Sequence, residues 1–148
     1  MAGPRELSHA LAGLGRCLFE QGRTSEAESM LRECLAVREK ALFDDWRRFD
    51  VMALLGGCLL GQKKYTEAEP LLIQGYEGLK TREAKIPNRV KPDLAEAAEW
   101  VIRLYEARDR PETAAAWRKK LGTGAGLPNK PTPEKMPDPT PKTGAESK

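Results

Sequence analysis

Apolar side chains recur at helical spacing in the first part of the chain. Leu11, Leu14 and Leu18 fall on one face of a predicted helix, and Ala27 and Leu31 fall on one face of the helix that follows. A short polar stretch separates the two apolar patterns. The pattern predicts two helices joined into a hairpin.

The same pattern occurs a second time, 41 positions further along the chain. Residues 10–31 align with residues 51–72, and about half of the aligned positions are identical. Self-similarity at a fixed spacing is the signature of a repeat protein. The identical positions are Ala12, Leu14, Gly15, Cys17, Leu18, Gln21, Glu26, Ala27, Glu28 and Leu31, which recur as Ala53, Leu55, Gly56, Cys58, Leu59, Gln62, Glu67, Ala68, Glu69 and Leu72.

Each predicted second helix opens with the sequence of a capping box. Ser25 is followed three residues later by Glu28, and Thr66 is followed by Glu69. In a capping box the two side chains accept hydrogen bonds from backbone N–H groups that the first helical turn leaves unpaired. The sequence therefore predicts that the second helices begin at Ser25 and Thr66.

A third, less regular pair of helices is predicted over residues 92–121. Asp93 and Glu96 have the spacing of a cap at its start. Ile102 stands at the position of the repeated glycine, and Arg118 stands at the position of the repeated leucine. Because a terminal repeat turns its outer face to water, this unit is interpreted as the cap of the stack.

These residues resemble the tetratricopeptide repeat. The resemblance rests on the Leu-Gly pairs at 14–15 and 55–56, on the apolar residue four positions after each leucine, and on the alanine early in each second helix. The tract KKYTEAEPLL, residues 63–72, is similar to the variety of the repeat found in kinesin light chains. The resemblance implies an all-α α-solenoid of about three antiparallel helical hairpins, over residues 5–42, 45–83 and 92–121 of a domain that spans 1–121.

The resemblance also implies a close crossing of the two helices in each hairpin. A small residue on the first helix faces a small residue on the second, so that Gly15 would contact Ala27 and Gly56 would contact Ala68. Gly57 is expected to face the concave side of the stack, with no packing role.

Two other stretches have the composition of irregular structure. Residues 81–93 contain Pro87 and Pro92 in a charged tract and are expected to form a surface loop. Residues 122–148 are rich in Pro, Lys and Thr and almost lack large apolar side chains, which predicts a disordered tail. The spaced prolines of this tail are compatible with a polyproline II ligand, although such tracts more often act as spacers.

Charge and composition narrow the class of partner. The 25 basic and 22 acidic residues give a net charge of +3, and the two signs are interleaved, so nucleic acid is not the expected partner. No secretion signal or apolar stretch of membrane-spanning length is visible. The three cysteines match no disulfide framework or metal motif. These features favour a cytoplasmic protein that does not bind a membrane.

Candidate catalytic residues do not assemble into a site. The single histidine, His9, has no nucleophile or orienting carboxylate near it in the sequence, and no metal or cofactor motif is present. Cys17 and Cys58 share one repeat position and are expected to be buried fillers. The three tryptophans are expected to pack at the joints between repeats. The sequence therefore predicts a protein without enzymatic activity or cofactor.

The resemblance places a peptide-binding groove on the concave face formed by the first helix of each hairpin. Arg16 and Arg103 would lie on either side of a hollow at Gly57, which favours a peptide segment with apolar and acidic side chains. The predicted groove residues are His9, Ala12, Arg16, Phe19, Asp50, Ala53, Gly57, Leu60, Glu96, Glu99, Arg103 and Glu106.

Three functions from different classes remain open on the sequence. The first is a scaffold or adaptor that binds a protein or peptide segment. The second is a regulatory or partner-docking segment, because residues 5–121 resemble the helical repeats that follow the catalytic domain of bacterial Ser/Thr protein kinases. None of the kinase motifs is present in this chain. The third, an enzyme, has no constellation of catalytic residues to support it.

Overall fold

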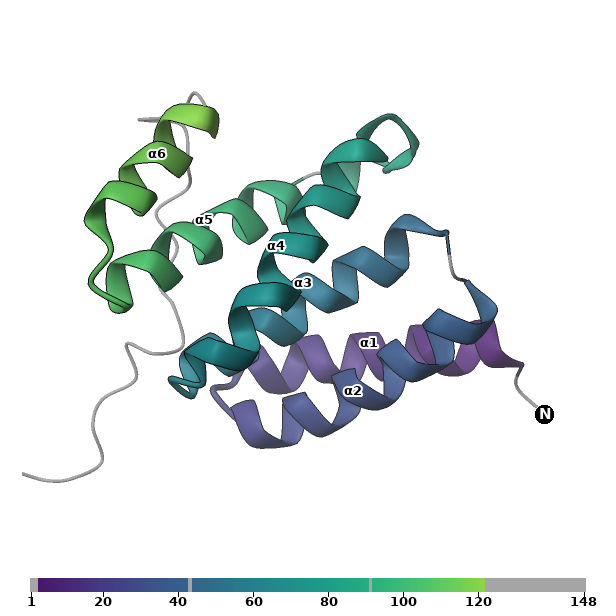
Figure 1. The fold of residues 1–148 in the computed structure, drawn as a ribbon. Coiled ribbons are helices and arrows are strands. Elements are labelled where there is room, and N and C mark those ends of the chain that lie inside the picture. Colours follow the sequence, from purple (N-terminus) through teal and green to yellow (C-terminus); the bar gives the residue numbers. More distant parts are fainter. Residues whose placement is uncertain (1–2, 43, 91, 122–148) are drawn as a thin grey trace, which may run out of the picture.

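The computed structural model describes residues 3–42, 44–90 and 92–121 of the 148-residue chain. Over these residues the protein is all-α, and its helices form three antiparallel hairpins (Figure 1). This confirms the predicted fold class, while the predicted disordered tail, residues 122–148, lies outside the described residues. The helices are α1 (Pro4–Glu20), α2 (Thr24–Ala41), α3 (Trp46–Gly61), α4 (Tyr65–Thr81), α5 (Pro92–Ala107) and α6 (Pro111–Leu121), with the short 3-10 helices η1 (Glu83–Lys85) and η2 (Asn88–Val90) before α5.

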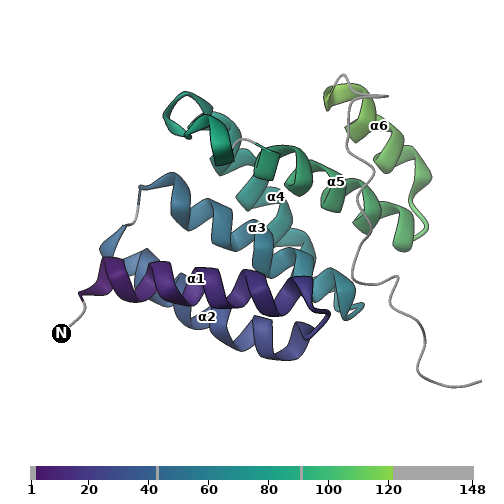
Figure 2. The same cartoon turned by 180° about the vertical axis from the view of Figure 1, so that it is seen from behind.

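The hairpins stack on one another in chain order. Helix α3 packs against α2 of the preceding hairpin, and α5 packs against both α3 and α4. In Figure 2 α1 lies in front of α2 and α3 lies in front of α4, so the first helices of the hairpins share one side of the stack. Consequently, residues at equivalent positions of α1, α3 and α5 are brought to a common surface.

All three hairpins turn through the same backbone motif. The residue after the C-cap has a positive φ in each case: 81° at Gly22, 66° at Lys63 and 59° at Asp109. The following N–H donates to a carbonyl five residues earlier, as Arg23 N does to Leu18 O at 2.9 Å. This pair of features is the Schellman motif, and it aligns the third hairpin with the first two despite its divergent sequence.

The predicted capping boxes are wrong. Helix α2 begins at Thr24 after the N-cap Arg23, and α4 begins at Tyr65 after the N-cap Lys64, with no side-chain capping bond at either start. The tight turn carries the chain directly into the helix, one residue earlier than the pattern suggests. Likewise α5 begins at Pro92, so Asp93 is already inside the helix.

The capping-box glutamates connect hairpins instead. Glu28 Oε1 accepts hydrogen bonds from Gln62 Nε2 at 3.0 Å and from Lys64 Nζ at 3.4 Å, both from the next turn. In the second hairpin, Glu69 accepts from the Tyr105 hydroxyl at 2.8 Å and from Arg108 NH1 at 2.7 Å. The repeated glutamate therefore joins each hairpin to the one that follows it.

The close crossing within each hairpin occurs at the repeated glycine, but against a different residue from the one predicted. A Cβ on Gly15 would lie 2.6 Å from Leu31 Cδ2, and a Cβ on Gly56 would lie 2.7 Å from Leu72 Cδ2. The predicted neighbours Ala27 and Ala68 are fully buried but are not the closest side chains. The repeated leucine fills the space that the missing side chain leaves.

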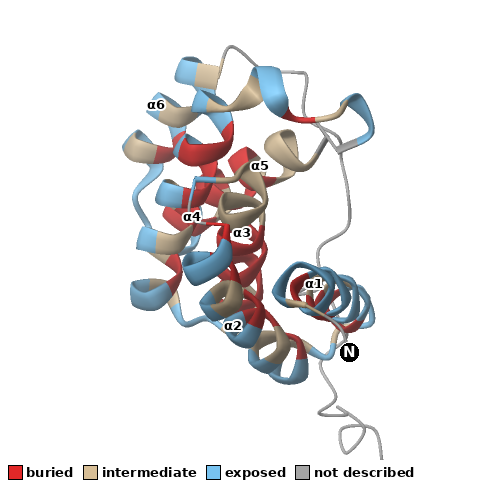
Figure 3. Ribbon diagram, turned by 90° about the vertical axis from the view of Figure 1, so that its right-hand side faces the viewer, coloured by how far each residue is buried: buried red, intermediate tan, exposed pale blue. Residues whose placement is uncertain are grey.

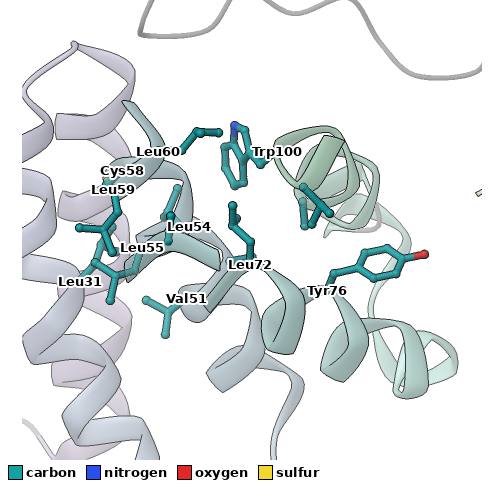
Figure 4. Packing of buried hydrophobic residues seen from close by; sticks show 14 of the residues in the cluster. Leu31, Val51, Leu54, Leu55, Cys58, Leu59, Leu60, Leu72, Tyr76 and Trp100 are labelled. Carbon is teal, nitrogen blue, oxygen red and sulfur yellow. The ribbon is translucent and has the colours of Figure 1, made fainter. Parts of the chain in front are cut away.

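The core runs through the centre of the stack along α3. Every residue from Val51 to Leu60 is buried, whereas α1 keeps exposed residues along much of its surface (Figure 3). Figure 4 shows the leucines of α3 between Leu31 of the first hairpin and Trp100 of the third. No helix in the described ranges is both long and apolar enough to cross a membrane.

The segment between the second and third hairpins is more ordered than the predicted surface loop. It contains two 3-10 turns, and Ile86 is 4% exposed within the core cluster. The prediction for the tryptophans is confirmed at two joints, because Trp100 stacks edge-on against Phe19 and Trp117 does so against Tyr76, both at 5.5 Å between ring centroids.

Cys17 and Cys58 differ in environment although they occupy the same repeat position. Cys58 is fully buried, as predicted, but Cys17 is exposed. The prediction for Cys17 is wrong because α1 has no preceding hairpin against it in this structure, whereas α3 packs on α2.

Candidate functional site

The concave surface lies between α1 and α5, with α3 behind it. Contacts at two places bridge α1 and α5 although these helices are distant in the sequence: Arg16 pairs with Glu96 at 3.0 Å and with Asp93 at 3.5 Å, and the Phe19 ring meets the Trp100 ring. These contacts divide the predicted groove into two ends with different properties.

The end nearer the hairpin turns is closed by aromatic packing. Phe19 is 3% exposed, Trp100 is 5% exposed and Leu60 is 6% exposed. A Cβ on Gly57 would lie 2.9 Å from the Trp100 indole. The hollow predicted at Gly57 is therefore filled by Trp100, and Gly57 is a packing position like Gly56.

Ala53 also differs from the prediction. Its side chain is 2% exposed, and its backbone N lies 2.7 Å from where a Cβ on Gly75 of α4 would be. Ala53 thus marks a close approach of α3 to α4 instead of contributing to an open groove.

The other end of the concave surface is open. A cleft of about 640 Å³ lies between the N-terminal parts of α1 and α3, the 3-10 helix η2 and the start of α5. Of the predicted groove residues, His9, Ala12, Arg16 and Asp50 line it. Glu99, Arg103 and Glu106 lie outside the cleft lining, as do Phe19, Ala53, Gly57 and Leu60.

A partly buried acidic pair lies in the wall of this cleft. The Asp50 and Asp93 carboxyl groups share a hydrogen bond, which requires a proton on one of them. Burial and the neighbouring Asp93 charge raise the pKa of Asp50 to about 7, although Arg16 and Arg38 oppose the shift. At neutral pH, the Asp50 carboxyl is therefore close to its midpoint between the protonated and ionised forms.

Arg16 is part of the same charged cluster. Its guanidinium lies 3.0 Å from Glu96 and 3.5 Å from Asp93. Burial alone would lower the pKa of Arg16, but the carboxylates of Glu96 and Asp93 raise it, so the side chain stays charged. Because these internal partners already neutralise Arg16, it is a weaker attractor for an acidic ligand than the sequence suggested.

Arg103 is also paired internally. Its Nε donates to Glu99 Oε2 at 2.9 Å, and Glu106 pairs with Arg118. The symmetry that the sequence predicted between Arg16 and Arg103 is therefore absent, because the two arginines hold different carboxylates and only Arg16 lines the cleft.

Two other arginines of the cleft carry unpaired charge. Arg5 at the start of α1 and Arg89 in η2 both line it, and neither forms an ion pair with another residue in the described parts of the chain. Arg47, in contrast, lies 3.1 Å from Asp45 and over the Trp46 ring. Trp46 and Leu54 supply apolar surface to the same cleft.

Arg38 is a buried residue of the cleft lining that the sequence analysis did not single out. It is 3% exposed, and its NH1 donates to Arg47 O at 2.7 Å while its Nε donates to Ser8 Oγ at 3.3 Å. These bonds tie α2 to both α1 and α3 beneath the cleft. The only sequence signal was an arginine in the second helix where the second repeat has the buried Leu79.

The chemistry of the cleft suits recognition of polar and apolar groups. In the described part of the chain, no group of three or more His, Cys, Asp or Glu residues is placed to hold a metal ion. The cleft instead combines an indole, aliphatic side chains, exposed guanidinium groups and a protonatable carboxyl pair. Such a mixture is typical of surfaces that bind protein segments.

The hairpins stack in chain order, share one turn motif and line a concave surface with their first helices. These features define an α-helical repeat protein of the kind that serves protein–protein interaction. A comparison with protein families agrees: the model of the tetratricopeptide repeat matches residues 6–81, about half of the chain. The chain belongs to the tetratricopeptide repeat family. The matched range covers the first two hairpins, and a search of curated proteins finds no match. The fold of this family is typically non-catalytic.

Proposed function

We propose that the protein is a scaffold or adaptor that binds a peptide segment of a partner protein in the cleft between α1, α3 and η2. The observation that carries the proposal is the asymmetry of the concave surface. Trp100 fills one end, whereas the other end keeps an open cleft with apolar side chains and two arginines that form no ion pair with any residue the structure describes.

The expected ligand remains a segment with apolar and acidic side chains, but the residues that would attract it differ from those predicted. Arg5 and Arg89 offer unneutralised positive charge, while Trp46 and Leu54 offer apolar contact. Both guanidinium groups are exposed, so they can form charge-assisted hydrogen bonds with a carboxylate of the ligand, and long-range attraction speeds association. A cytoplasmic location is consistent with this role and is part of the proposal.

The proposal is tested with two libraries of short peptides, one built from Leu, Phe and Glu and the other with Lys in place of Glu. The acidic library should contain binders whose affinity falls with added salt. Binding to the full chain is measured by isothermal titration. The double variant Arg5→Glu with Arg89→Glu should weaken binding at least tenfold, and its remaining binding should depend less on salt.

The matched control is Arg110→Glu, which reverses an exposed arginine on the α5–α6 turn, outside the cleft. It should leave the affinity unchanged. Equal binding of the acidic and basic libraries, or equal losses in the two charge-reversal proteins, would show that the cleft arginines do not recognise the ligand.

A second candidate function is regulation of, or docking to, a bacterial Ser/Thr protein kinase. The resemblance of residues 5–121 to the repeats that follow such catalytic domains favours it. A purified kinase of this class should then bind the full chain, and the Arg5→Glu, Arg89→Glu protein should show whether the cleft is the surface used. Absence of binding at micromolar concentrations would leave the peptide scaffold as the better proposal.

A further inference from the structure

The first helix carries an apolar stripe on the side opposite Arg16 and Phe19, and of its members only Ala10 also borders the cleft. Its members recur every three or four residues and so share one side of α1. Leu7 is 42% exposed and Leu14 is 49% exposed, and among the described residues these are the large hydrophobic side chains that remain exposed. The stripe, called the α1 stripe below, consists of Leu7, Ala10, Leu14 and Cys17, all of them exposed, and the exposed Gln21 follows it at the C-cap of α1.

At three of these positions, the equivalent residues in the other two hairpins are buried. The turn residues Gly22, Lys63 and Asp109 occupy the same place in each Schellman motif and so set the alignment. The residues equivalent to Ala10, Leu14 and Cys17 are Val51, Leu55 and Cys58 in α3, and Ala97, Val101 and Leu104 in α5. All six are at most 1% exposed.

What covers these positions in α3 and α5 is the second helix of the preceding hairpin. Helix α2 packs on α3, and α4 packs on α5. At each joint the repeated leucine, Leu31 or Leu72, is fully buried. The same helix supplies the repeated glutamate, Glu28 or Glu69, to the following turn. The joint therefore has one apolar and one polar component.

Helix α1 and the turn after it carry the apolar and the polar residues that form the α3 side of this joint. Leu14, Cys17 and Gln21 are identical to Leu55, Cys58 and Gln62, which form the α3 side of the joint with α2. Arg23 stands where Lys64 binds Glu28, and in this structure its guanidinium holds Glu26 of its own helix at 2.7 Å. A glutamate from an incoming helix would find a cation and an amide in the same relative positions.

We propose that the α1 stripe docks the second helix of another tetratricopeptide-type hairpin, one that carries a glutamate and a leucine at the positions of Glu28 and Leu31. The two joints inside this chain identify the partner helix. In each of them, the residues equivalent to the α1 stripe pack against the second helix of a hairpin. Docking would bury Leu14 and Cys17 to the extent seen for their equivalents and would extend the stack by one unit.

A second copy of this chain does not offer that helix at its other end. In α6 the position of Glu28 and Glu69 is held by Ala115, and the position of the repeated leucine is held by the exposed Arg118. The end of the stack at α6 is a polar cap, whereas the end at α1 is an apolar joint. Head-to-tail assembly of identical copies is therefore not expected.

The exposed thiol of Cys17 provides a direct readout, because its equivalent Cys58 is completely covered. The probe is a polypeptide of residues 4–42 of this chain, with Cys17→Ala and Cys34→Ala, which presents α2 with Glu28 and Leu31. The full chain is mixed with increasing probe, treated with a thiol reagent, and the rate of Cys17 modification is followed by mass spectrometry. Saturating probe should slow this modification at least tenfold.

Two variants test the two components of the joint. Leu14→Glu in the full chain should abolish the protection of Cys17, and the helical content should stay the same because Leu14 is half exposed. Glu28→Ala in the probe should weaken the protection by removing the contact to Gln21 and Arg23. The matched control, Ala116→Glu on the exposed face of α6, should leave the protection unchanged.

Two results would overturn the proposal. One is a Cys17 rate that the probe, confirmed as helical by circular dichroism, does not change up to the limit of its solubility. The other is slow modification of Cys17 in the chain alone, together with sedimentation as a dimer that Leu14→Glu dissociates. That result would show that the α1 stripe pairs with its own copy instead of with the second helix of a hairpin.

Discussion

Replacing Gly75 by alanine tests how tightly the second hairpin is packed. Gly75 lies in α4 where that helix crosses α3, and a Cβ there would lie 2.7 Å from the Ala53 backbone N and 3.0 Å from its Cα. Atoms in van der Waals contact are about 3.5–4.0 Å apart, so the added methyl group falls short by nearly 1 Å. Because the opposing atoms belong to a helix backbone, no side-chain rotation can make room.

The magnitude follows from two opposing terms. Overpacking a well-packed core costs about 1–3 kcal/mol, and the rigid backbone neighbour places this site toward the upper end. Alanine in place of glycine within a helix raises the free energy of unfolding by about 1 kcal/mol through its higher helix propensity. We therefore expect Gly75→Ala to lower the free energy of unfolding by about 1–2 kcal/mol and the melting temperature by about 4–8 °C.

Gly13→Ala is the matched control. Gly13 is exposed in the middle of α1, and a Cβ there would meet nothing within 4 Å. Only the helix-propensity term applies, so the substitution should stabilise the protein by up to about 1 kcal/mol. Both proteins are compared by urea titration followed by circular dichroism. A Gly75→Ala protein as stable as Gly13→Ala would refute the close approach of α4 to α3.

Two further predictions concern buried polar groups. Glu69→Ala should remove the hydrogen-bond partner of Tyr105 and Arg108 and lower the free energy of unfolding by about 1–2 kcal/mol. Burial is the largest cause of the raised Tyr105 pKa of about 12, and the Glu69 hydrogen bond is the next. The variant should therefore lower the Tyr105 pKa, a shift that ultraviolet titration detects. Glu67→Ala, on the exposed side of the same turn, should do neither. The raised pKa of Asp50, about 7 in the folded protein against about 3.9 in an unfolded chain, means that its contribution to stability is greatest below about pH 4 and is lost as the pH rises to about 7. Asp50→Asn should abolish this loss in melts across that range, and the exposed Asp109→Asn should preserve it. Identical pH profiles for Asp50→Asn and the unmodified protein would contradict the raised pKa of Asp50.

The helices and their repetition could be predicted from the sequence because they depend on local spacing. The recurrence of Leu14, Gly15 and Leu31 at a fixed interval specifies a helical hairpin without knowledge of its neighbours. The divergent third unit was predicted from the apolar spacing of residues 92–121, although Ile102 and Arg118 depart from the repeat pattern. These features depend only on which residues share a helix face, and the spacing of residues in a single sequence is sufficient to show this.

Local sequence patterns could not predict that the capping boxes do not form or that one end of the groove is closed. Ser25 with Glu28 has the local pattern of a cap, but Glu28 hydrogen-bonds to the next hairpin, because the turn at Gly22 already specifies the helix start. Gly57 faces the concave surface as the repeat implies, yet Trp100, 43 positions later, fills the space above it. Both outcomes depend on contacts between hairpins, and helical spacing carries no information on such contacts.

The sequence by itself determined an all-α repeat with a polar cap at α6, and only the tertiary structure decided which parts of its surface are available to a partner. Cys17 and Cys58 show the reason most directly, because the same residue in the same repeat position is exposed in α1 and buried in α3. Periodicity assigns each residue to a face of a helix. Whether that face is covered depends on the presence of a neighbouring hairpin, which is a property of the stack and not of the repeat.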